Sequence, residues 1–318
     1  METLLKDLAV KIIPRTVLSE YTTFRLGGPC RALIPCQNPA QVENAVKRLS
    51  QDNLPFILIG GGSNMVISDE GVDCFVIRYL TQSPLIEQEG YDLIVSGSTV
   101  LDHLALFAAQ NGLEGLNYTT GIPGTVGGAV AGNAGAFGRQ VGDVLKSVVL
   151  LTRDGHKKEA TPKNLNFKYR DSILKKTEDI LLSARFSLKP GDSKSLLKER
   201  EEILNIRREK HPNLITHPCA GSFFRNIEPT SRAGKRQAAG WFLDEAGGRK
   251  LFHGGARIFE KHANIIIKSD GCRAQDVFEL SQKMANLVKQ NFNLELIREV
   301  RFVGKFEGMP ADIQGIIW

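Results

Sequence analysis

The sequence contains few cysteines, and they form neither a disulfide framework nor a familiar metal finger. Five occur among 318 residues, an odd number, and no two are spaced as Cys-x-x-Cys. This usage is typical of reduced thiols in a cytosolic protein rather than of a secreted disulfide scaffold. His211, His217 and Cys219 are neighbours in sequence, but prolines separate them and no fourth ligand is evident, so we expect no metal site.

Long apolar runs are also absent. No run approaches the roughly 20 residues that a membrane-spanning helix requires. The segment from Met1 to Pro14 is interrupted by charged residues, so it lacks the apolar core of a signal peptide. We therefore expect a cytoplasmic protein without membrane insertion.

Positive charge is in excess but is not concentrated. The net charge is +6 and the pI about 9.0, yet Lys and Arg alternate with acidic residues, as in residues 194–210. Such mixing does not form the basic patch that nucleic acid requires, so no nucleic-acid partner is expected. Small phosphorylated ligands remain compatible with the charge.

Two common nucleotide-binding motifs are missing from a sequence that is rich in glycine. No glycine segment has the Gly-Lys-Ser/Thr ending of a P-loop, and none has the Gly-x-Gly-x-x-Gly pattern opening a long helix with an acidic residue downstream. The 31 glycines instead cluster in residues 60–64 (GGGSN), 121–128 (GIPGTVGG) and 132–138 (GNAGAFG). Consecutive glycines can form a nest of backbone N–H groups for pyrophosphate, to which Ser63 and Asn64 could add side-chain donors. The second region is small and neutral, which favours close contact with an extended ligand; a flexible turn is the alternative for residues 60–64.

The apolar pattern predicts short strands mixed with helices, and therefore an α+β fold. Residues 189–193 (KPGDS) are the best candidate for a linker between two halves. The expected helices are 39–52, 101–110, 194–210, 237–246 and 274–290, and the expected strands are 56–59, 74–77, 93–96, 148–152, 180–188, 264–268 and 299–303.

The ordered motifs resemble the UDP-N-acetylenolpyruvoylglucosamine reductase family over roughly residues 20–304. The first half carries residues 23–29 (TFRLGGP) and the three glycine segments; the second carries 169–172 (YRDS), 220–226 (AGSFFRN), 239–244 (AGWFLD), 261–264 (KHAN) and 299–301 (EVR). The resemblance implies a two-lobed FAD-binding domain of the vanillyl-alcohol-oxidase (PCMH) type in residues 1–190. It further implies an α+β substrate domain in residues 194–304 and a tail in residues 305–318.

The resemblance also implies the cofactors and the reaction. NADPH would reduce FAD, and UDP-N-acetylglucosamine enolpyruvate would then take the hydride and become UDP-N-acetylmuramate, a peptidoglycan precursor. In the reverse direction the resemblance implies a UDP-N-acetylmuramate dehydrogenase. The residues expected to hold FAD are Gly60, Gly61, Gly62, Ser63, Asn64, Gly121, Ile122, Pro123, Gly124, Thr125, Gly127 and Gly128.

Three residues match the catalytic positions of the family. Arg170 and a protonated Glu299 would stabilise the charge that flows into the substrate carboxylate. Ser222 would donate the proton to the neighbouring carbon, acting as an acid and not as a nucleophile. Asn226 matches the position that contacts the substrate diphosphate, with Arg225 nearby. Taken singly, each could instead be an ion pair or a turn cap.

The match has departures, and two other functions stay open on the residues alone. Pro is often found after the Asn at 226 and before the Glu at 299, where this chain has Ile227 and Arg298. The short interval between Arg170 and Ser222 predicts the shorter subgroup, which lacks a tyrosine-bearing lid. A flavin-dependent alcohol oxidase would not require the three catalytic residues and would often attach its flavin covalently. A non-catalytic flavin or sugar-nucleotide binding module is the remaining alternative.

Overall fold

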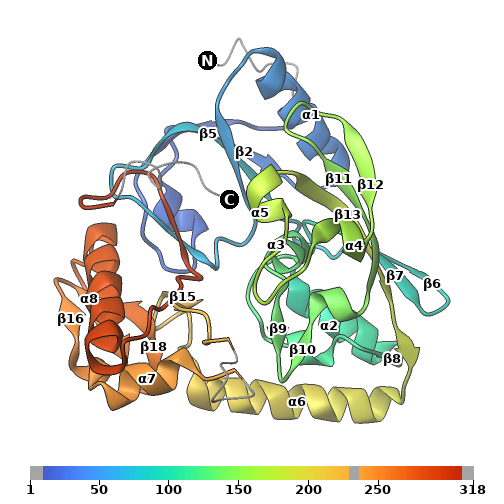
Figure 1. Ribbon diagram of the computed structural model, residues 1–318. Helices are drawn as coiled ribbons and strands as arrows, with labels where there is room; N and C mark the ends of the chain where they lie inside the picture. Colours follow the sequence, from blue (N-terminus) through green and yellow to red (C-terminus); the bar gives the residue numbers. More distant parts are fainter. Residues whose placement is uncertain (1–9, 229–235, 310–318) are drawn as a thin grey trace.

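The computed structural model describes residues 10–228 and 236–309 and contains three main sheets (Figure 1). The first has the strand order β1-β2-β5-β3, with β2, β5 and β3 parallel and β1 antiparallel to β2. Helix α1 (Pro39–Gln51) begins where the Asn38 side chain accepts a hydrogen bond from the Gln41 N–H, and its buried face covers this sheet. The strands are β1 (Ile13–Pro14), β2 (Cys30–Cys36), β3 (Phe56–Ile59) and β5 (Val72–Tyr79).

The second sheet is antiparallel and has the order β12-β11-β13-β7-β6. Helix α2 (Leu101–Gln110) and the short helix α3 (Val126–Ala131) contribute to the core beside it. The glycine segments lie between the strands of these two sheets, and the second of them runs into the first turn of α3. The strands are β6 (Ile86–Glu89), β7 (Asp92–Ser96), β11 (Leu145–Leu151), β12 (Lys157–Ala160) and β13 (Ile180–Ser187).

The third sheet belongs to the C-terminal half and has the antiparallel order β15-β18-β17-β16. Helices α7 (Ala239–Glu245) and α8 (Ala274–Phe292) pack with it around a core that includes Phe223, Phe278 and Phe302. The strands are β15 (Cys219–Ser222), β16 (Phe252–His253), β17 (Ala256–Phe259) and β18 (His262–Lys268).

The long helix α6 (Ser193–Lys210) connects the halves along one side of the molecule (Figure 1). It is attached to the first half, because Arg200 forms a bidentate ion pair with Asp102 of α2, with both N–O distances 2.7 Å. The predicted linker before it is partly ordered as β14 (Lys189–Pro190), which pairs with β8 (Leu113–Glu114). Two residues of the predicted linker are therefore ordered by pairing with the backbone of β8.

The C-terminal strand returns to the first half. Strand β19 (Arg301–Val303) lies parallel to β4 (Met65–Ile67), which follows the loop 60–64 directly. The predicted strand 299–303 begins two residues later than expected, so Glu299 precedes it. Phe306 and Met309, assigned above to a tail, are buried in the C-terminal core, while residues 310–318 lie outside the described part.

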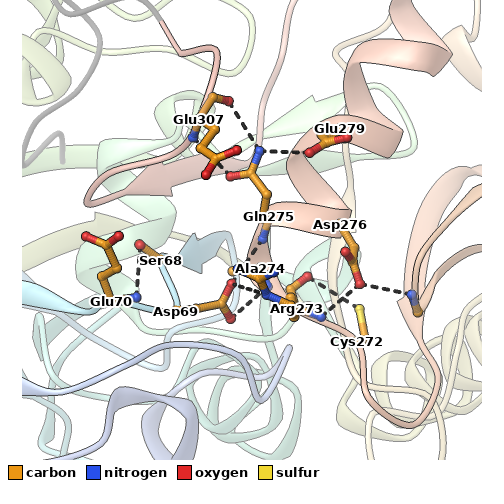
Figure 2. Close-up of polar contacts among 11 residues, drawn as sticks. Ser68, Asp69, Glu70, Cys272, Arg273, Ala274, Gln275, Asp276, Glu279 and Glu307 are labelled. Atoms are coloured by element: carbon orange, nitrogen blue, oxygen red, sulfur yellow. Dashed lines mark hydrogen bonds and ion pairs between the residues drawn. The ribbon is translucent and has the colours of Figure 1, made fainter.

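A second connection between the halves is shown in Figure 2. Asp69, in the loop after β4, accepts hydrogen bonds from the N–H groups of Ala274 (2.9 Å) and Gln275 (3.3 Å) at the start of α8. The Asp276 carboxylate accepts from the Arg273 and Gly255 N–H groups at 3.0 and 2.9 Å. Since the first N–H groups of a helix have no partner within the helix, Asp69 satisfies two of them from the other half of the chain.

We expect Asp69→Ala to lower the free energy of unfolding by about 1 kcal/mol, the usual cost of losing a side-chain cap. A urea titration followed by circular dichroism measures the loss. Asp69→Asn, which keeps one acceptor oxygen, is the matched control and should lose less. Equal stability of Asp69→Ala and the unchanged protein would contradict this role.

All five cysteines are free thiols. In the described part of the chain, no helix is both long and apolar enough to cross a membrane.

Candidate active site

The two glycine regions predicted from the sequence lie against each other. The Ser63 hydroxyl donates a hydrogen bond to the Pro123 carbonyl at 3.0 Å. Glycine is needed at the contact: a Cβ on Gly60 would lie 2.5 Å from the Thr125 hydroxyl oxygen. Gly124 has φ +123°, and a Cβ there would lie 2.8 Å from the Ser63 hydroxyl oxygen. The clustering of glycine therefore reflects close packing of two loops as well as access to a ligand.

These loops line a cavity of about 950 Å³. All twelve residues predicted to hold FAD are in its wall, which the sheets of the first half, α6 and β15 complete. The twelve are Gly60, Gly61, Gly62, Ser63, Asn64, Gly121, Ile122, Pro123, Gly124, Thr125, Gly127 and Gly128. Thr125 also caps α3, because its hydroxyl accepts a hydrogen bond from the Gly128 N–H at 3.3 Å.

Helix α6 contributes a wall of this cavity that the sequence reasoning missed. Leu204, Arg207 and Lys210 line it, and Arg207 donates from Nε to the Thr120 carbonyl at 2.6 Å. Within this helix Leu196 and Ile203 are buried, whereas Leu197 is 38% exposed. Leu196, Arg200, Ile203 and Arg207 recur at intervals of three and four and share one face, but this spacing does not indicate that a cavity lies beside the helix.

A second, smaller cavity of about 370 Å³ is lined mainly by the C-terminal half, with Tyr169 and Arg170 of the first half also in its wall. Its wall includes Asn226, Trp241, Arg249 and His262. The two cavities share three wall residues, namely Arg170, Ser222 and Glu299. These are the three residues that the family resemblance marked as catalytic, and they come from three separate stretches of the chain.

Arg170 has an unusual backbone conformation at this junction. Its φ is +55°, in the left-handed region that residues other than glycine rarely adopt. The Lys175 ammonium donates to the Arg170 carbonyl at 2.5 Å, which helps to hold this turn. The Arg170 Nε lies 3.6 Å from a Glu299 carboxyl oxygen and, within the described residues, is buried without a hydrogen-bond partner. An unpartnered, positioned guanidinium N–H at the junction is suited to receive an anionic group.

Burial raises the pKa of Glu299 above its ordinary value, although Arg170, Lys175 and Arg225 act in the opposite direction. Burial also lowers the pKa of Lys175 to about 8 and that of Arg301 to about 10. The junction is therefore a desolvated cluster of cations around a carboxyl group that binds a proton more readily than usual. Lys175 and Arg301, which also line the larger cavity, were not predicted. Their proximity in sequence could have indicated them, because Lys175 lies five residues after Arg170 and Arg301 lies two residues after Glu299.

Glu299 is held from the first half as well. The Asn64 side chain donates to the Glu299 carbonyl at 3.3 Å, and the Arg301 N–H donates to the Asn64 carbonyl at 3.1 Å. Asn64 was predicted as a cofactor donor, and the structure also gives it this contact between the glycine loop and the segment that bears Glu299.

The two predicted substrate-binding residues occupy different places. Asn226 lines the smaller cavity, and its side-chain oxygen accepts a hydrogen bond from the Ala239 N–H at 3.2 Å. Arg225 is outside the walls of both cavities and lies 3.9 Å from an Asp171 carboxyl oxygen. Its charge therefore acts from behind the junction. Trp241, also in the wall of the smaller cavity, is 53% exposed.

The larger cavity suits FAD. Its glycine rim leaves backbone groups accessible, apolar side chains such as Leu58 and Leu174 provide surfaces for ring systems, and Arg207, Arg208 and Lys210 provide positive charge for a diphosphate. Arg170 is also in its wall, and its Nε, 3.6 Å from a Glu299 carboxyl oxygen, has no hydrogen-bond partner among the described residues. Within residues 10–228 and 236–309, no group of three His, Cys, Asp or Glu side chains is placed to hold a metal ion.

Comparisons with known proteins also distinguish a first half and a C-terminal half of the chain. Residues 30–161 match the family described as FAD binding domain, and residues 212–303 match the family described as UDP-N-acetylenolpyruvoylglucosamine reductase, C-terminal domain. The chain is 35% identical to UDP-N-acetylenolpyruvoylglucosamine reductase 1 of Bacillus cereus, over 96% of this chain and 100% of the relative. It is 36% identical to the reductase of Lactobacillus acidophilus, over 95% of this chain and 98% of the relative.

A solved structure has the same fold. The crystal structure of UDP-N-acetylenolpyruvylglucosamine reductase (MurB) from Thermus caldophilus superposes with a TM-score of 0.75 at 30% identity, covering 92% of this chain and 98% of that one. The predicted α+β fold, with an FAD-binding domain followed by the C-terminal domain of this reductase family, is thus confirmed.

Proposed function

The chain belongs to the family of UDP-N-acetylenolpyruvoylglucosamine reductases, and we propose that its two cavities hold the two reactants of that reaction. FAD occupies the larger cavity and the enolpyruvyl sugar nucleotide the smaller one. The observation that supports this assignment is the shared wall of Arg170, Ser222 and Glu299, because the reacting carbons must lie where the two cavities meet.

Bound FAD supplies the hydride, which it obtains from NADPH. The substrate accepts this hydride at its vinyl methylene carbon, and the electron pair of the double bond moves toward the carboxylate. Arg170 and protonated Glu299 donate hydrogen bonds to the carboxylate and stabilise the negative charge that develops there. Glu299 can remain protonated at the junction because burial raises its pKa.

Ser222 completes the reduction. Its hydroxyl gives a proton to the carbon beside the carboxylate, which forms UDP-N-acetylmuramate. A hydroxyl is a weak acid, so it must face a strongly basic carbon and be held in line with it. The neighbouring Phe223 helps to hold Ser222 in place. Its carbonyl accepts a hydrogen bond from the Glu299 N–H at 2.8 Å, which links the segment that bears Ser222 to the segment that bears Glu299.

Two further assignments follow from the walls of the smaller cavity. Asn226 contacts the diphosphate of the sugar nucleotide, and Arg225 adds positive charge from behind the wall.

We place the domain boundary after α6, since that helix is bound to α2 by the ion pair between Arg200 and Asp102. The five free thiols support a location in the cytoplasm, where such thiols stay reduced.

The function is tested with the purified protein loaded with FAD. NADPH is expected to bleach the flavin absorbance, and the enolpyruvyl substrate is expected to restore it in the absence of oxygen, with UDP-N-acetylmuramate as the product. Restoration by oxygen with an alcohol as reductant would indicate an oxidase. A protein that binds FAD but catalyses neither step would be a binding module.

A further inference from the structure

A buried side-chain amide forms two hydrogen bonds to the backbone of Phe224, two residues after Ser222. Asn264 is 2% exposed, lies in β18 and forms part of the wall of the smaller cavity. Its side-chain oxygen accepts from the Phe224 N–H at 3.0 Å, and its side-chain nitrogen donates to the Phe224 carbonyl at 2.8 Å. Both ends of the side chain are thus used on the backbone of one residue.

These two hydrogen bonds lie where the regular backbone pairing of β15 with β18 ends. Strands β15 and β18 pair at Cys219 with Ile267 and at Ser222 with Ile265, with a register shift between the two pairs. The Phe223 N–H then donates to the Asn264 carbonyl at 2.8 Å. Beyond that point the side chain of Asn264 offers Phe224 the donor and acceptor that a strand would otherwise provide.

On their opposite edge, residues 223–225 are hydrogen-bonded to residues 297–299, the segment that bears Glu299. The Phe223 carbonyl accepts from the Glu299 N–H, and the Arg225 N–H donates to the Ile297 carbonyl at 2.9 Å. Phe223 and Phe224 are buried, so the segment cannot satisfy these groups with water. The spacing between Ser222 and Glu299 therefore depends on a dipeptide that is clamped from two sides.

We propose that Asn264 is a positioning residue that holds the Ser222 hydroxyl in register with Glu299 at the junction of the two cavities. The inference rests on the proposed function, since it assigns Asn264 an effect through Ser222. It predicts that loss of the amide affects protonation of the substrate and leaves the reduction of FAD by NADPH unchanged. A geometric displacement of this kind costs on the order of ten- to a hundredfold in rate.

The experiment compares Asn264→Ala, Ser222→Ala and the double variant as FAD-loaded proteins in anaerobic stopped flow. We expect Asn264→Ala to be reduced by NADPH at the normal rate and reoxidised by the substrate roughly ten- to a hundredfold more slowly. Because Asn264 acts through Ser222, the double variant should be no slower than Ser222→Ala alone. Multiplied effects in the double variant, or normal reoxidation of Asn264→Ala, would overturn the proposal.

Asn117 offers a matched control for the loss of a buried amide. It is 1% exposed and donates to the Leu196 carbonyl and to Glu199, at 3.2 and 2.6 Å, away from both cavities. Asn117→Ala should lower stability without slowing reoxidation; equal slowing in both variants would mean that general loosening explains the effect. If Asn264→Ala does not fold, Asn264→Asp replaces it. Its protonated acid can make both bonds, so its rate relative to the unchanged protein should fall as pH rises, and a constant ratio would overturn the proposal.

Failure of the underlying assignment has a different signature. If Ser222 is not the acid, Ser222→Ala alone will be reoxidised at the normal rate, whatever Asn264→Ala does.

Discussion

Replacing Ser222 with alanine is expected to lower the turnover of the enolpyruvyl substrate by about 10²- to 10⁴-fold, the usual contribution of a positioned general acid. The variant is expected to keep the backbone contacts of β15 and loses only the side-chain hydroxyl group. Formation of UDP-N-acetylmuramate at saturating NADPH and substrate measures the loss.

The matched control is Ser222→Cys, which restores an ionisable proton at the same place. A thiol is a stronger acid than a hydroxyl. The cysteine variant should therefore be faster than the alanine variant, even if its geometry is less suitable. An alanine variant within a few-fold of the unchanged protein would show that the proton comes from another group.

Replacing Glu299 is expected to give the second largest loss of turnover. The direction in which turnover changes with pH shows which protonation state of Glu299 is active. Glu299→Ala removes a donor to the developing carboxylate charge and should reduce turnover by about 10²- to 10³-fold. Glu299→Gln keeps a neutral N–H donor of nearly the same shape, so most of the activity should remain. Steady-state rates of the two variants at one pH are sufficient for this comparison.

The pH profile separates a protonated Glu299 from an ionised one. Burial raises the pKa of Glu299, so the donor form persists at higher pH than for an ordinary glutamate. As pH rises through this pKa the proton is lost and turnover should fall. Glu299→Gln cannot ionise, so this fall should be absent from its profile. An inactive Gln variant, or an unchanged descending limb, would mean that the ionised carboxylate is the working form.

The sequence predicted the local parts of this site well because they depend on short stretches of chain. The run of three glycines after an apolar strand indicated a cradle, with a flexible turn as the alternative, and all twelve predicted lining residues lie in the wall of one cavity. Helix boundaries such as those of α2 were equally local, since its apolar positions repeat at helical spacing and Asn111-Gly112 ends it.

The parts that were missed depend on contacts between distant segments. Nothing in residues 194–210 states that one side of the helix faces a cofactor cavity, because that side becomes distinct only when α6 packs on α2. The start of β19 is similar: the pairing with β4 begins at Arg301, and Glu299 is instead bonded to Phe223 and Asn64. Residues from three stretches meet at the junction only through these tertiary contacts.

The most direct test of the junction is anaerobic stopped flow on Ser222→Ala, with flavin absorbance recorded for each half-reaction. NADPH should reduce the flavin at nearly the rate of the unchanged protein, while reoxidation by the enolpyruvyl substrate should be slower by orders of magnitude. Equal slowing of both half-reactions, or of neither, would contradict the assignment of Ser222 as the proton donor between the two cavities.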